Sequence, residues 1–267
     1  MSLRNNKALG QHWLKNREIL DEIAELACYG VTDSENLDDL ESAENLAGKA
    51  RVCLEIGPGL GTLTSSLLKL FDKVVAVEFD VRLANNLPKS FPGKNLEVVN
   101  GDILDFDYST IQEKYVIAGN IPYYITSPII EKTLTAKHKP ERVVLLIQKE
   151  VAERIINDKE TVLSLFVKNL AEVYAGPVVL KGEFTPPPKV DSQVIVMEPR
   201  DKPVVSEKTI SLIKQGFKAP RKKLVHNLAG FKSQDELKKI FVELGIDENA
   251  RPGDLGLDKW GELYDAL

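Results

Sequence analysis

The sequence predicts an α/β fold with a small helical second domain, and two observations lead to this prediction. Over residues 1–200, short continuous apolar runs alternate with segments of helical periodicity. That alternation is typical of a parallel sheet whose two faces are covered by helices. Beyond residue 200 the apolar runs cease and only short amphipathic patterns follow. We therefore expect a sheet domain over residues 1–200 and a small helical domain over residues 201–267.

The composition favours an ordinary globular enzyme. Hydrophobic residues make up 43% of the 267 residues, which is enough for a sizeable core. No apolar run reaches roughly 18 residues, and residues 1–7 lack the apolar centre of a signal peptide. We therefore expect a cytoplasmic protein that does not engage a membrane. The net charge of −5 gives no overall attraction for nucleic acid, so RNA binding would depend on a local basic surface.

Neither the cysteines nor the histidines form a metal-binding pattern. Cys28 and Cys53 lack CxxC spacing and lie within apolar patterns. We expect them to be buried free thiols rather than a disulfide or a zinc site. His12, His138 and His226 are scattered along the chain, so the sequence predicts neither a catalytic triad nor a metal centre.

The first elements are a polar and aromatic segment at residues 7–14 and a helix that begins near Asn16. Apolar residues recur at helical spacing and define the buried face of this helix. These residues are Ile19, Leu20, Ile23, Leu26 and Ala27. Residues 33–44 contain six acidic residues and no basic one, which is typical of a solvated segment that links the helix to the first strand.

A glycine-rich turn follows the first predicted strand, residues 51–56. Residues 57–61, Gly-Pro-Gly-Leu-Gly, lead from this strand into a helix. Glycine lets the backbone approach a ligand closely, so Gly57 and Gly59 are candidate cofactor-binding residues. The G-x-G-x-G spacing, with Glu55 before it, is similar to the S-adenosylmethionine loop of class I methyltransferases. A plain tight turn is the alternative.

Two further predicted strands end in acidic residues. Strand 73–77 is followed by Glu78, and strand 96–99 is followed by Asp102. In a parallel sheet these ends meet at one edge, where Glu78 could accept hydrogen bonds from the ribose hydroxyls of an adenosine-containing cofactor. Asp102 could accept one from the adenine amine. Each acid alone could be a helix cap, but successive strand ends carrying a glycine loop and two acids favour one shared site.

At the fourth strand end, a short apolar run leads into residues 119–124, Gly-Asn-Ile-Pro-Tyr-Tyr. The N6 lone pair of adenine is delocalised into the ring, so two acceptors for its N–H groups would help to localise it. The Asn120 side chain and the Ile121 carbonyl can be these acceptors. Pro122 would fix the turn, and Tyr123 could stack on the base. The alternative is a plain turn in which these residues cap, stiffen and pack.

The remaining elements complete the sheet and define the helical domain. Pro128 lies in the first turn of a predicted helix. Strands are expected at 143–147, 178–179 and 194–196, and helices at 150–156, 162–174, 206–217, 220–229, 233–244 and 258–267. The strands at 178–179 and 194–196 would close the sheet as an antiparallel pair. The three prolines at 186–188, between them, predict a stiff extended arm.

A basic cluster lies in the predicted helical domain. Residues 214–232 contain no acidic residue and six basic ones: Lys214, Lys218, Arg221, Lys222, Lys223 and Lys232. A solvated helix face is the usual meaning of such a run. Beside an adenine-modifying site it would be a natural surface for RNA phosphates. The predicted RNA-binding residues are Lys218, Arg221, Lys222 and Lys223.

Six segments occur in an order that is specific to one enzyme family. They are LGQHWL at 9–14, LEIGPGLG at 54–61, GD at 101–102, NIPY at 120–123, QKEV at 148–151 and FTPPPKVDS at 184–192. From about residue 7 to the C-terminal helices, the chain resembles the KsgA/RsmA family of small-subunit rRNA adenine dimethyltransferases. The resemblance implies a class I, Rossmann-like methyltransferase sheet. It also implies that S-adenosylmethionine is bound by His12, Leu14, Gly57, Glu78, Asp102 and Asn120, and that Phe184 helps to enclose the target base.

The chain departs from the family pattern at three places. Trp13 stands where phenylalanine is usual, which keeps an aromatic ring. Thr161 and Val162 replace a frequent Tyr-Gly pair, so no base contact is assigned there. Residues 251–254 follow the pattern only loosely, and no RNA contact is assigned to them.

The resulting hypothesis is a methyltransferase that acts on N6 of two adjacent adenosines near the 3′ end of small-subunit rRNA, during ribosome biogenesis. Its catalytic residues would be Asn120, Ile121, Pro122, Tyr123 and Phe184. Methyl transfer from a sulfonium needs no strong base, so positioning carries the catalysis. The expected partner is the precursor small subunit, bound by a monomer without a metal ion. Two alternatives stay open: a large-subunit rRNA adenine methylase of the macrolide-resistance type, and an assembly factor acting mainly by binding.

Overall fold

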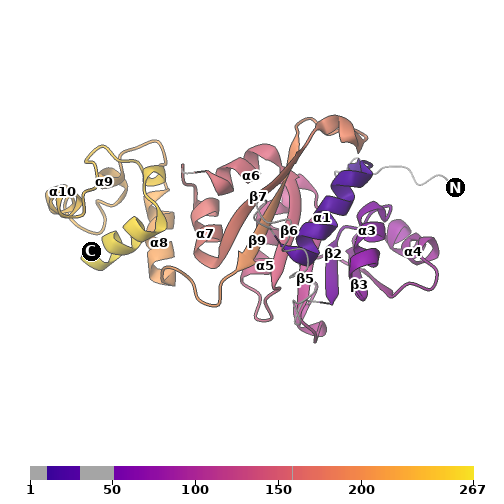
Figure 1. The fold of residues 1–267 in the computed structure, drawn as a ribbon. Helices are drawn as coiled ribbons and strands as arrows, with labels where there is room; N and C mark the ends of the chain where they lie inside the picture. Colours follow the sequence, from indigo (N-terminus) through magenta and orange to yellow (C-terminus); the bar gives the residue numbers. More distant parts are fainter. Residues whose placement is uncertain (1–10, 31–50, 158) are drawn as a thin grey trace, which may run out of the picture. The chain divides into compact units, whose positions relative to one another are not determined.

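The computed structural model describes residues 11–30, 51–157 and 159–267. The predicted acidic segment at 33–44 and the beginning of the predicted segment at 7–14 lie outside these residues. Seven strands form one sheet: β2 (Val52–Ile56), β3 (Lys73–Glu78), β4 (Leu96–Asn100), β5 (Tyr115–Asn120), β6 (Arg142–Gln148), β7 (Ala171–Val179) and β9 (Ser192–Pro199). Their order across the sheet is β4-β3-β2-β5-β6-β9-β7 (Figure 1).

The sheet is mainly parallel, as the sequence predicts. Strands β4, β3, β2, β5 and β6 pair in parallel, whereas β9 runs antiparallel to β6. All five residues of β2 are buried and four of them are apolar, which is typical of a parallel strand whose two faces are both covered. The arrangement confirms the predicted α/β class with a Rossmann-like sheet.

Helices α1 (Arg17–Tyr29) and α3 (Thr62–Leu70) pack on one face of this sheet. Apolar residues of α1, including Leu20 and Ile23, belong to the same core cluster as alternate residues of the central strands. The side chain of Asn16 accepts hydrogen bonds from the backbone N–H groups of two residues in the first turn of α1. This cap confirms the predicted start of the helix. The sheet region further contains α4 (Val81–Ser90), α5 (Thr126–Leu134) and α6 (Lys149–Ile156).

The predicted helix at 162–174 is too long. Helix α7 (Val162–Leu170) stops where β7 begins at Ala171. A Cβ at Gly176 would lie 2.8 Å from the Cβ of Val194, so β7 lies tight against β9 at a residue that has no side chain. The pairing of β7 next to β9 therefore overrides the helical periodicity. The signal in the sequence was the strand-favouring Val173 and Tyr174 within the predicted helix, followed by Val178 and Val179.

A separate two-stranded sheet joins the N-terminal segment to the proline-rich arm. Strand β1 (Trp13–Leu14) pairs antiparallel with β8 (Phe184–Thr185). The register places Leu14 opposite Phe184 and Trp13 opposite Thr185. Two segments that the sequence analysis treated separately are therefore parts of one structure.

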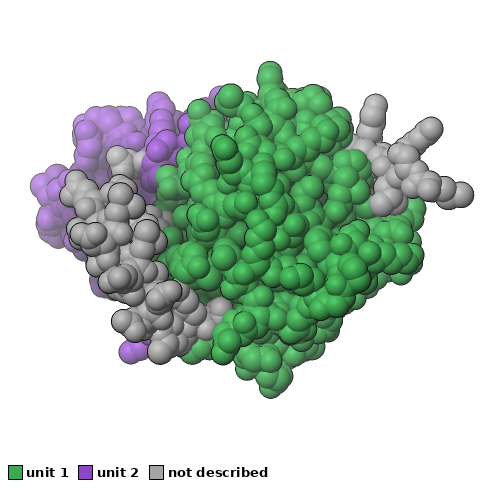
Figure 2. All heavy atoms as spheres, turned by 45° about the vertical axis from the view of Figure 1, so that its right-hand side comes forward, with its two compact units in different colours: residues 1–152, 174–199 green, residues 153–173, 200–267 purple. Residues whose placement is uncertain are grey.

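Contacts divide the chain into two compact units (Figure 2). The first comprises residues 1–152 and 174–199, and the second comprises residues 153–173 and 200–267. Besides α7, the second unit contains α8 (Glu207–Gly216), α9 (Leu224–Asn227), α10 (Gln234–Glu243) and α11 (Leu257–Ala266). Its core includes the fully buried Trp260, whose ring lies 6.3 Å from that of Phe217. The functions assigned to the two parts of the chain stay predictions.

Apart from α7, the helices of the second unit agree with the predicted ones except at α9. The predicted capping box of Ser233 and Glu236 is present at the start of α10. Helix α9 has four residues, fewer than the predicted 220–229, because residues 219–222 form a turn in which the Lys222 N–H donates to the Ala219 carbonyl. No helix among residues 11–30, 51–157 and 159–267 is long and apolar enough to cross a bilayer.

Candidate active site

A cavity of about 190 Å³ opens at the edge where the parallel strands end. Strands β3, β2 and β5 are neighbours in the sheet, so their carboxyl ends bring three loops together. The cavity is lined by most of the predicted site residues: His12, Gly57, Gly59, Glu78, Asp102, Asn120, Ile121, Pro122 and Tyr123. The structure thus brings most of the predicted cofactor and catalytic residues into one place, with Leu14 and Phe184 as the exceptions.

The glycine turn after β2 runs close under an aromatic ring. Gly57 and Gly59 have φ angles of 65° and 58°, a region that favours glycine. A Cβ at Gly59 would lie 3.0 Å from Nε1 of Trp13, so a side chain at this residue would crowd the Trp13 ring. The Gly59 N–H donates to Glu78 Oε2 at 3.0 Å. The end of β3 therefore holds the turn that follows β2.

Two buried carboxylates line the cavity. Glu78 accepts from the backbone N–H groups of Gly59 and Asp80, and burial raises its pKa. Glu55 accepts a 2.6 Å hydrogen bond from the Thr64 hydroxyl. Burial is the main cause that raises the pKa of Glu55 to about 8. A cationic ligand in the cavity would therefore stabilise the charged form of these two carboxyl groups.

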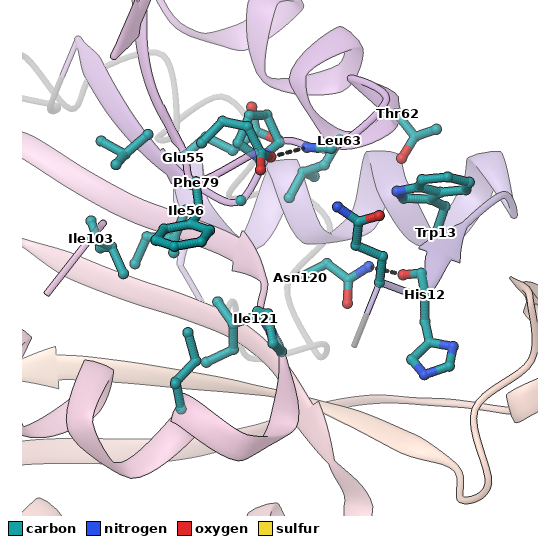
Figure 3. Close-up of a pocket in the computed structure, with 18 of the residues that line it drawn as sticks. His12, Trp13, Glu55, Ile56, Thr62, Leu63, Phe79, Ile103, Asn120 and Ile121 are labelled. Atoms are coloured by element: carbon teal, nitrogen blue, oxygen red, sulfur yellow. Dashed lines mark hydrogen bonds between the residues drawn. The ribbon is translucent and has the colours of Figure 1, made fainter. Parts of the chain in front are cut away.

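Apolar residues directly after the strand-end acids also line the cavity, and the sequence analysis did not assign them. Phe79 follows Glu78 and is 60% exposed, whereas Ile103 follows Asp102 and is buried. Figure 3 shows Phe79 and Ile103 on the side of the cavity away from Trp13. Asp102 itself accepts from the Leu104 N–H at 2.9 Å. The signal that could have identified both apolar residues is their position one step beyond each acid.

The side chain of Asn120 is oriented by the N-terminal segment. Its amide nitrogen donates to the backbone carbonyl of His12 at 2.9 Å (Figure 3). A carbonyl oxygen can only accept, so the amide NH₂ must face His12. The side-chain oxygen Oδ1 is then the Asn120 atom that remains to accept from another group in the cavity. His12 is held in turn by a 2.8 Å hydrogen bond between Nδ1 and the Pro186 carbonyl.

Tyr123 is fixed at both ends of its side chain. Its hydroxyl lies 2.7 Å from Oγ of the fully buried Ser192, and its ring stacks on the His12 ring with centroids 6.2 Å apart. Burial raises the pKa of the phenol, so the hydroxyl keeps its proton at neutral pH. Sequence reasoning did not assign Ser192 a role, because the contact joins residues that are 69 positions apart.

Leu14 and Phe184 lie away from the cavity lining. Their side chains are 0% and 3% exposed and belong to the core cluster that includes residues of α1. Leu14 pairs with Phe184 in the two-stranded sheet and is not part of the cavity lining, and its contact with the cofactor stays a prediction. The role of Phe184 at the target base stays a prediction.

The four predicted RNA-binding residues lie together in the second unit. Lys218, Arg221, Lys222 and Lys223 are all exposed, between α8 and α9. They belong to the connection before α9 rather than to a long helix, and Lys223 is the residue before its first turn. Their contact with RNA stays a prediction.

Neither cysteine forms a disulfide; Cys53 is buried and Cys28 is half-buried. Across the described ranges, no three His, Cys, Asp or Glu side chains are grouped so that they could hold a metal ion.

Comparisons with known proteins point to one family. The model of the ribosomal RNA adenine dimethylase family matches residues 2–267. Ribosomal RNA small subunit methyltransferase A of Rippkaea orientalis is 37% identical over 274 residues, covering 95% of this chain and 94% of that protein. The enzyme of the same name from Synechocystis is 36% identical over 288 residues, covering 100% of this chain and 98% of that protein.

Two solved structures share the fold over nearly the whole chain. A dimethyladenosine transferase from Plasmodium falciparum has a TM-score of 0.75 and 26% identity, covering 94% of this chain and 96% of that one. The 23S rRNA methyltransferase ErmE also has a TM-score of 0.75 and 26% identity, covering 96% of this chain and 99% of that one.

Proposed function

Because this chain belongs to the ribosomal RNA adenine dimethylase family, we propose that it methylates N6 of two adjacent adenosines near the 3′ end of small-subunit rRNA. Each adenosine would become N6,N6-dimethyladenosine. The observation that carries the proposal is the orientation of Asn120, whose amide nitrogen is occupied by His12. Its oxygen is thereby left as an acceptor at the wall of a cavity that also contains the cofactor-binding loops.

The cavity fits S-adenosylmethionine as the methyl donor. Glu78 still has lone pairs for ribose hydroxyls after accepting two backbone N–H groups, and Asp102 can accept from the adenine amine. Phe79 and Ile103 offer apolar contacts for the two faces of the adenine ring. The backbone of the Gly57 turn can approach the ligand without a side chain in between. When bound, the cofactor supplies an electrophilic methyl group whose departure needs no acid or base.

The chain's own residues then have to aim the adenine amine. Asn120 Oδ1 and the Ile121 carbonyl accept its two N–H groups, which localises the nitrogen lone pair. Tyr123 stacks on the base, and its ring is held in place by Ser192 and His12. Phe184 is buried, so the proposed contact with the second face of the base requires residues 184–185 to shift out of the core. Catalysis is by positioning, in a cavity from which water is displaced.

The small subunit is favoured over the large subunit as the substrate. The fold is shared equally with ErmE and with the dimethyladenosine transferase, so the fold does not discriminate between them. The relatives that are 36–37% identical over nearly their full length are small-subunit methyltransferases. A role in ribosome assembly by binding is compatible with this activity. We further propose that the enzyme acts as a cytoplasmic monomer on the precursor of the small subunit.

The direct test uses ribosomes from a strain that lacks small-subunit adenine dimethylation. Purified protein and S-adenosylmethionine would be incubated separately with small and large subunits from this strain, and the rRNA nucleosides analysed by mass spectrometry. Dimethyladenosine should appear only in small-subunit rRNA, and primer extension should stop at two adjacent adenosines near its 3′ end. Modification of the large subunit alone would support the macrolide-resistance type of activity instead.

A further inference from the structure

Two consecutive tyrosines at the end of β5 have opposite environments. Tyr123 is half-buried, and its hydroxyl is bonded to Ser192. Tyr124, the next residue of the short helical turn η4 (Tyr123–Ile125), lines the same cavity but is 65% exposed. Within the described part of the chain, no aromatic ring stacks on Tyr124 and its hydroxyl makes no hydrogen bond. A large flat side chain is thus presented to solvent at the mouth of the cavity.

Tyr124 lies away from the end of the cavity that suits the cofactor's adenine. That end contains Phe79, which follows β3, whereas Tyr124 follows β5. Strand β2 lies between these two strands, so their ends are two strand spacings apart, about 10 Å. Tyr124 is instead the chain neighbour of the residue proposed to stack on the target base.

We propose that Tyr124 is a stacking platform for the nucleotide next to the target adenosine, an inference that rests on the proposed function. Extracting a base from its strand leaves the neighbouring base without a stacking partner on one side. A second aromatic ring can replace that partner, because Tyr124 lines the same cavity as Tyr123 and its side chain is exposed. Successive aromatic side chains that stack on successive bases are a general device for binding single strands.

The same geometry gives a reason for the pairing of the two target adenosines. While one adenosine occupies the cavity, the other is its neighbour and would lie on Tyr124. After the roles of the two nucleotides exchange, the neighbour lies on the other side of the target along the strand, so Tyr124 contacts it in only one of the two arrangements. A purine next to the target should therefore be bound better than a pyrimidine, since it offers the larger surface for stacking on the tyrosine ring.

The first test compares Tyr124→Ala with Tyr124→Trp on undermethylated small subunits. Base stacking on an aromatic side chain corresponds to a factor of about 5 to 150 in binding. Tyr124→Ala should raise KM for the subunit within that range while leaving the affinity for S-adenosylmethionine unchanged. Tyr124→Trp should retain the parent KM. The matched control is Phe79→Ala, which removes another exposed aromatic ring from the same cavity and should weaken cofactor binding instead.

A double-mutant cycle, which combines Tyr124→Ala with an altered rRNA, separates base stacking from a purely structural role of Tyr124. Small subunits in which one of the two adenosines is replaced by uridine would be methylated at the remaining adenosine by the parent enzyme and by Tyr124→Ala. Uridine at one of the two positions should raise KM for the parent, and this increase should disappear in Tyr124→Ala. Equal uridine effects in both enzymes, or an unchanged KM in Tyr124→Ala, would overturn the stacking role. If the parent enzyme fails to methylate unaltered small subunits, the proposed function fails instead.

Discussion

Asn120 uses its two polar groups for different purposes. The amide nitrogen is bound to the His12 carbonyl, and the oxygen is left to accept a hydrogen bond, which we propose comes from the substrate amine. An unmethylated N6 has two N–H groups, but the monomethylated amine has one, so one acceptor goes unused in the second transfer. The loss of one hydrogen bond, about 0.5–1.5 kcal/mol, predicts a second transfer that is slower by up to about tenfold but not blocked.

Asn120→Ala should therefore impair both transfers. A hydrogen bond to a group that becomes charged is worth about 1.5–3 kcal/mol, so each rate should fall by about 10- to 150-fold. Tyr123→Phe is the matched control, because it keeps the stacking ring and loses only the bond to Ser192, with a mild effect on activity. Mass spectrometry of nucleosides from a timed reaction on undermethylated small subunits measures both rates. Full activity in Asn120→Ala would remove the catalytic role of this loop, and monomethyladenosine as the final product would contradict dimethylation.

Glu55 should make stability depend on pH. Its pKa is raised from 4.5 to about 8 by burial, so the folded chain keeps a proton that the unfolded chain has lost. The stability associated with this proton is fully present below pH 4.5. It falls by about 1.4 kcal/mol per pH unit as the pH rises towards about 8, where the folded chain also loses the proton.

Glu55→Gln has no proton to lose and should remove this dependence. Between pH 6 and pH 8, its free energy of unfolding should increase relative to that of the parent. Urea unfolding at pH 6, 7 and 8 measures the difference. The control is Glu248→Gln, which changes an exposed carboxyl in the second unit and should leave the parent profile unchanged. Parallel profiles for Glu55→Gln and the parent would contradict the raised pKa.

At the scale of elements, the site consists of strand ends that hold one another. The acid at the end of β3 accepts from the turn after β2, and the N-terminal segment crosses to the Asn120 loop after β5. The same segment pairs through β1 with β8, next to the Pro186 carbonyl that holds His12. The segments proposed to close over the cofactor and to position the target base are therefore parts of one connected structure.

Glu78→Ala tests the link between β3 and the glycine turn. Loss of the carboxylate leaves polar groups unpaired and should weaken S-adenosylmethionine binding by about 1–3 kcal/mol, or about 5- to 150-fold. Glu78→Gln keeps one oxygen acceptor and should lose less. Titration calorimetry measures the affinity, with Glu97→Ala, an exposed carboxylate on β4, as the control that should bind normally. Unchanged affinity in Glu78→Ala would show that the acid does not contact the cofactor.

At the scale of the whole molecule, the candidate active site and the basic cluster belong to different compact units. The cavity is formed by residues of the first unit, whereas Arg221, Lys222 and Lys223 belong to the second, which has its own apolar core. Changes in the basic cluster should therefore affect RNA binding without affecting the cofactor site.

Reversing the charges of Arg221, Lys222 and Lys223 to glutamate should weaken binding to small subunits and spare cofactor affinity. Each lost phosphate contact should lower the magnitude of the slope of log affinity against log salt by about 0.7. Binding measured over a salt series tests this expectation. The control reverses three other exposed lysines of the same unit, Lys208, Lys238 and Lys239, and so has the same net charge. Equal slopes for the parent and the triple variant would show that the basic cluster does not contact RNA phosphates.

The sequence alone determined the sheet, its glycine turn, the strand-end acids and the Asn120 loop. Each of these is local: a residue one or two positions beyond a buried strand is placed by that strand, and parallel topology brings the strand ends to one edge. Local patterns also led to the largest error in the secondary structure, where helical periodicity after Val162 continued into residues that form β7.

Only the tertiary structure decided how the site is oriented. The His12 carbonyl meets the Asn120 amide across 108 positions, and the His12 ring meets the Pro186 carbonyl across 174. Tertiary packing also decided three further features. They are the burial of Phe184, the contact between Tyr123 and Ser192, and the exposure of Tyr124. Such contacts depend on which distant segments pack together, and local propensity contains no information about that packing. The sequence therefore identified the candidate site residues, and the packing of distant segments determined the direction in which each of them faces.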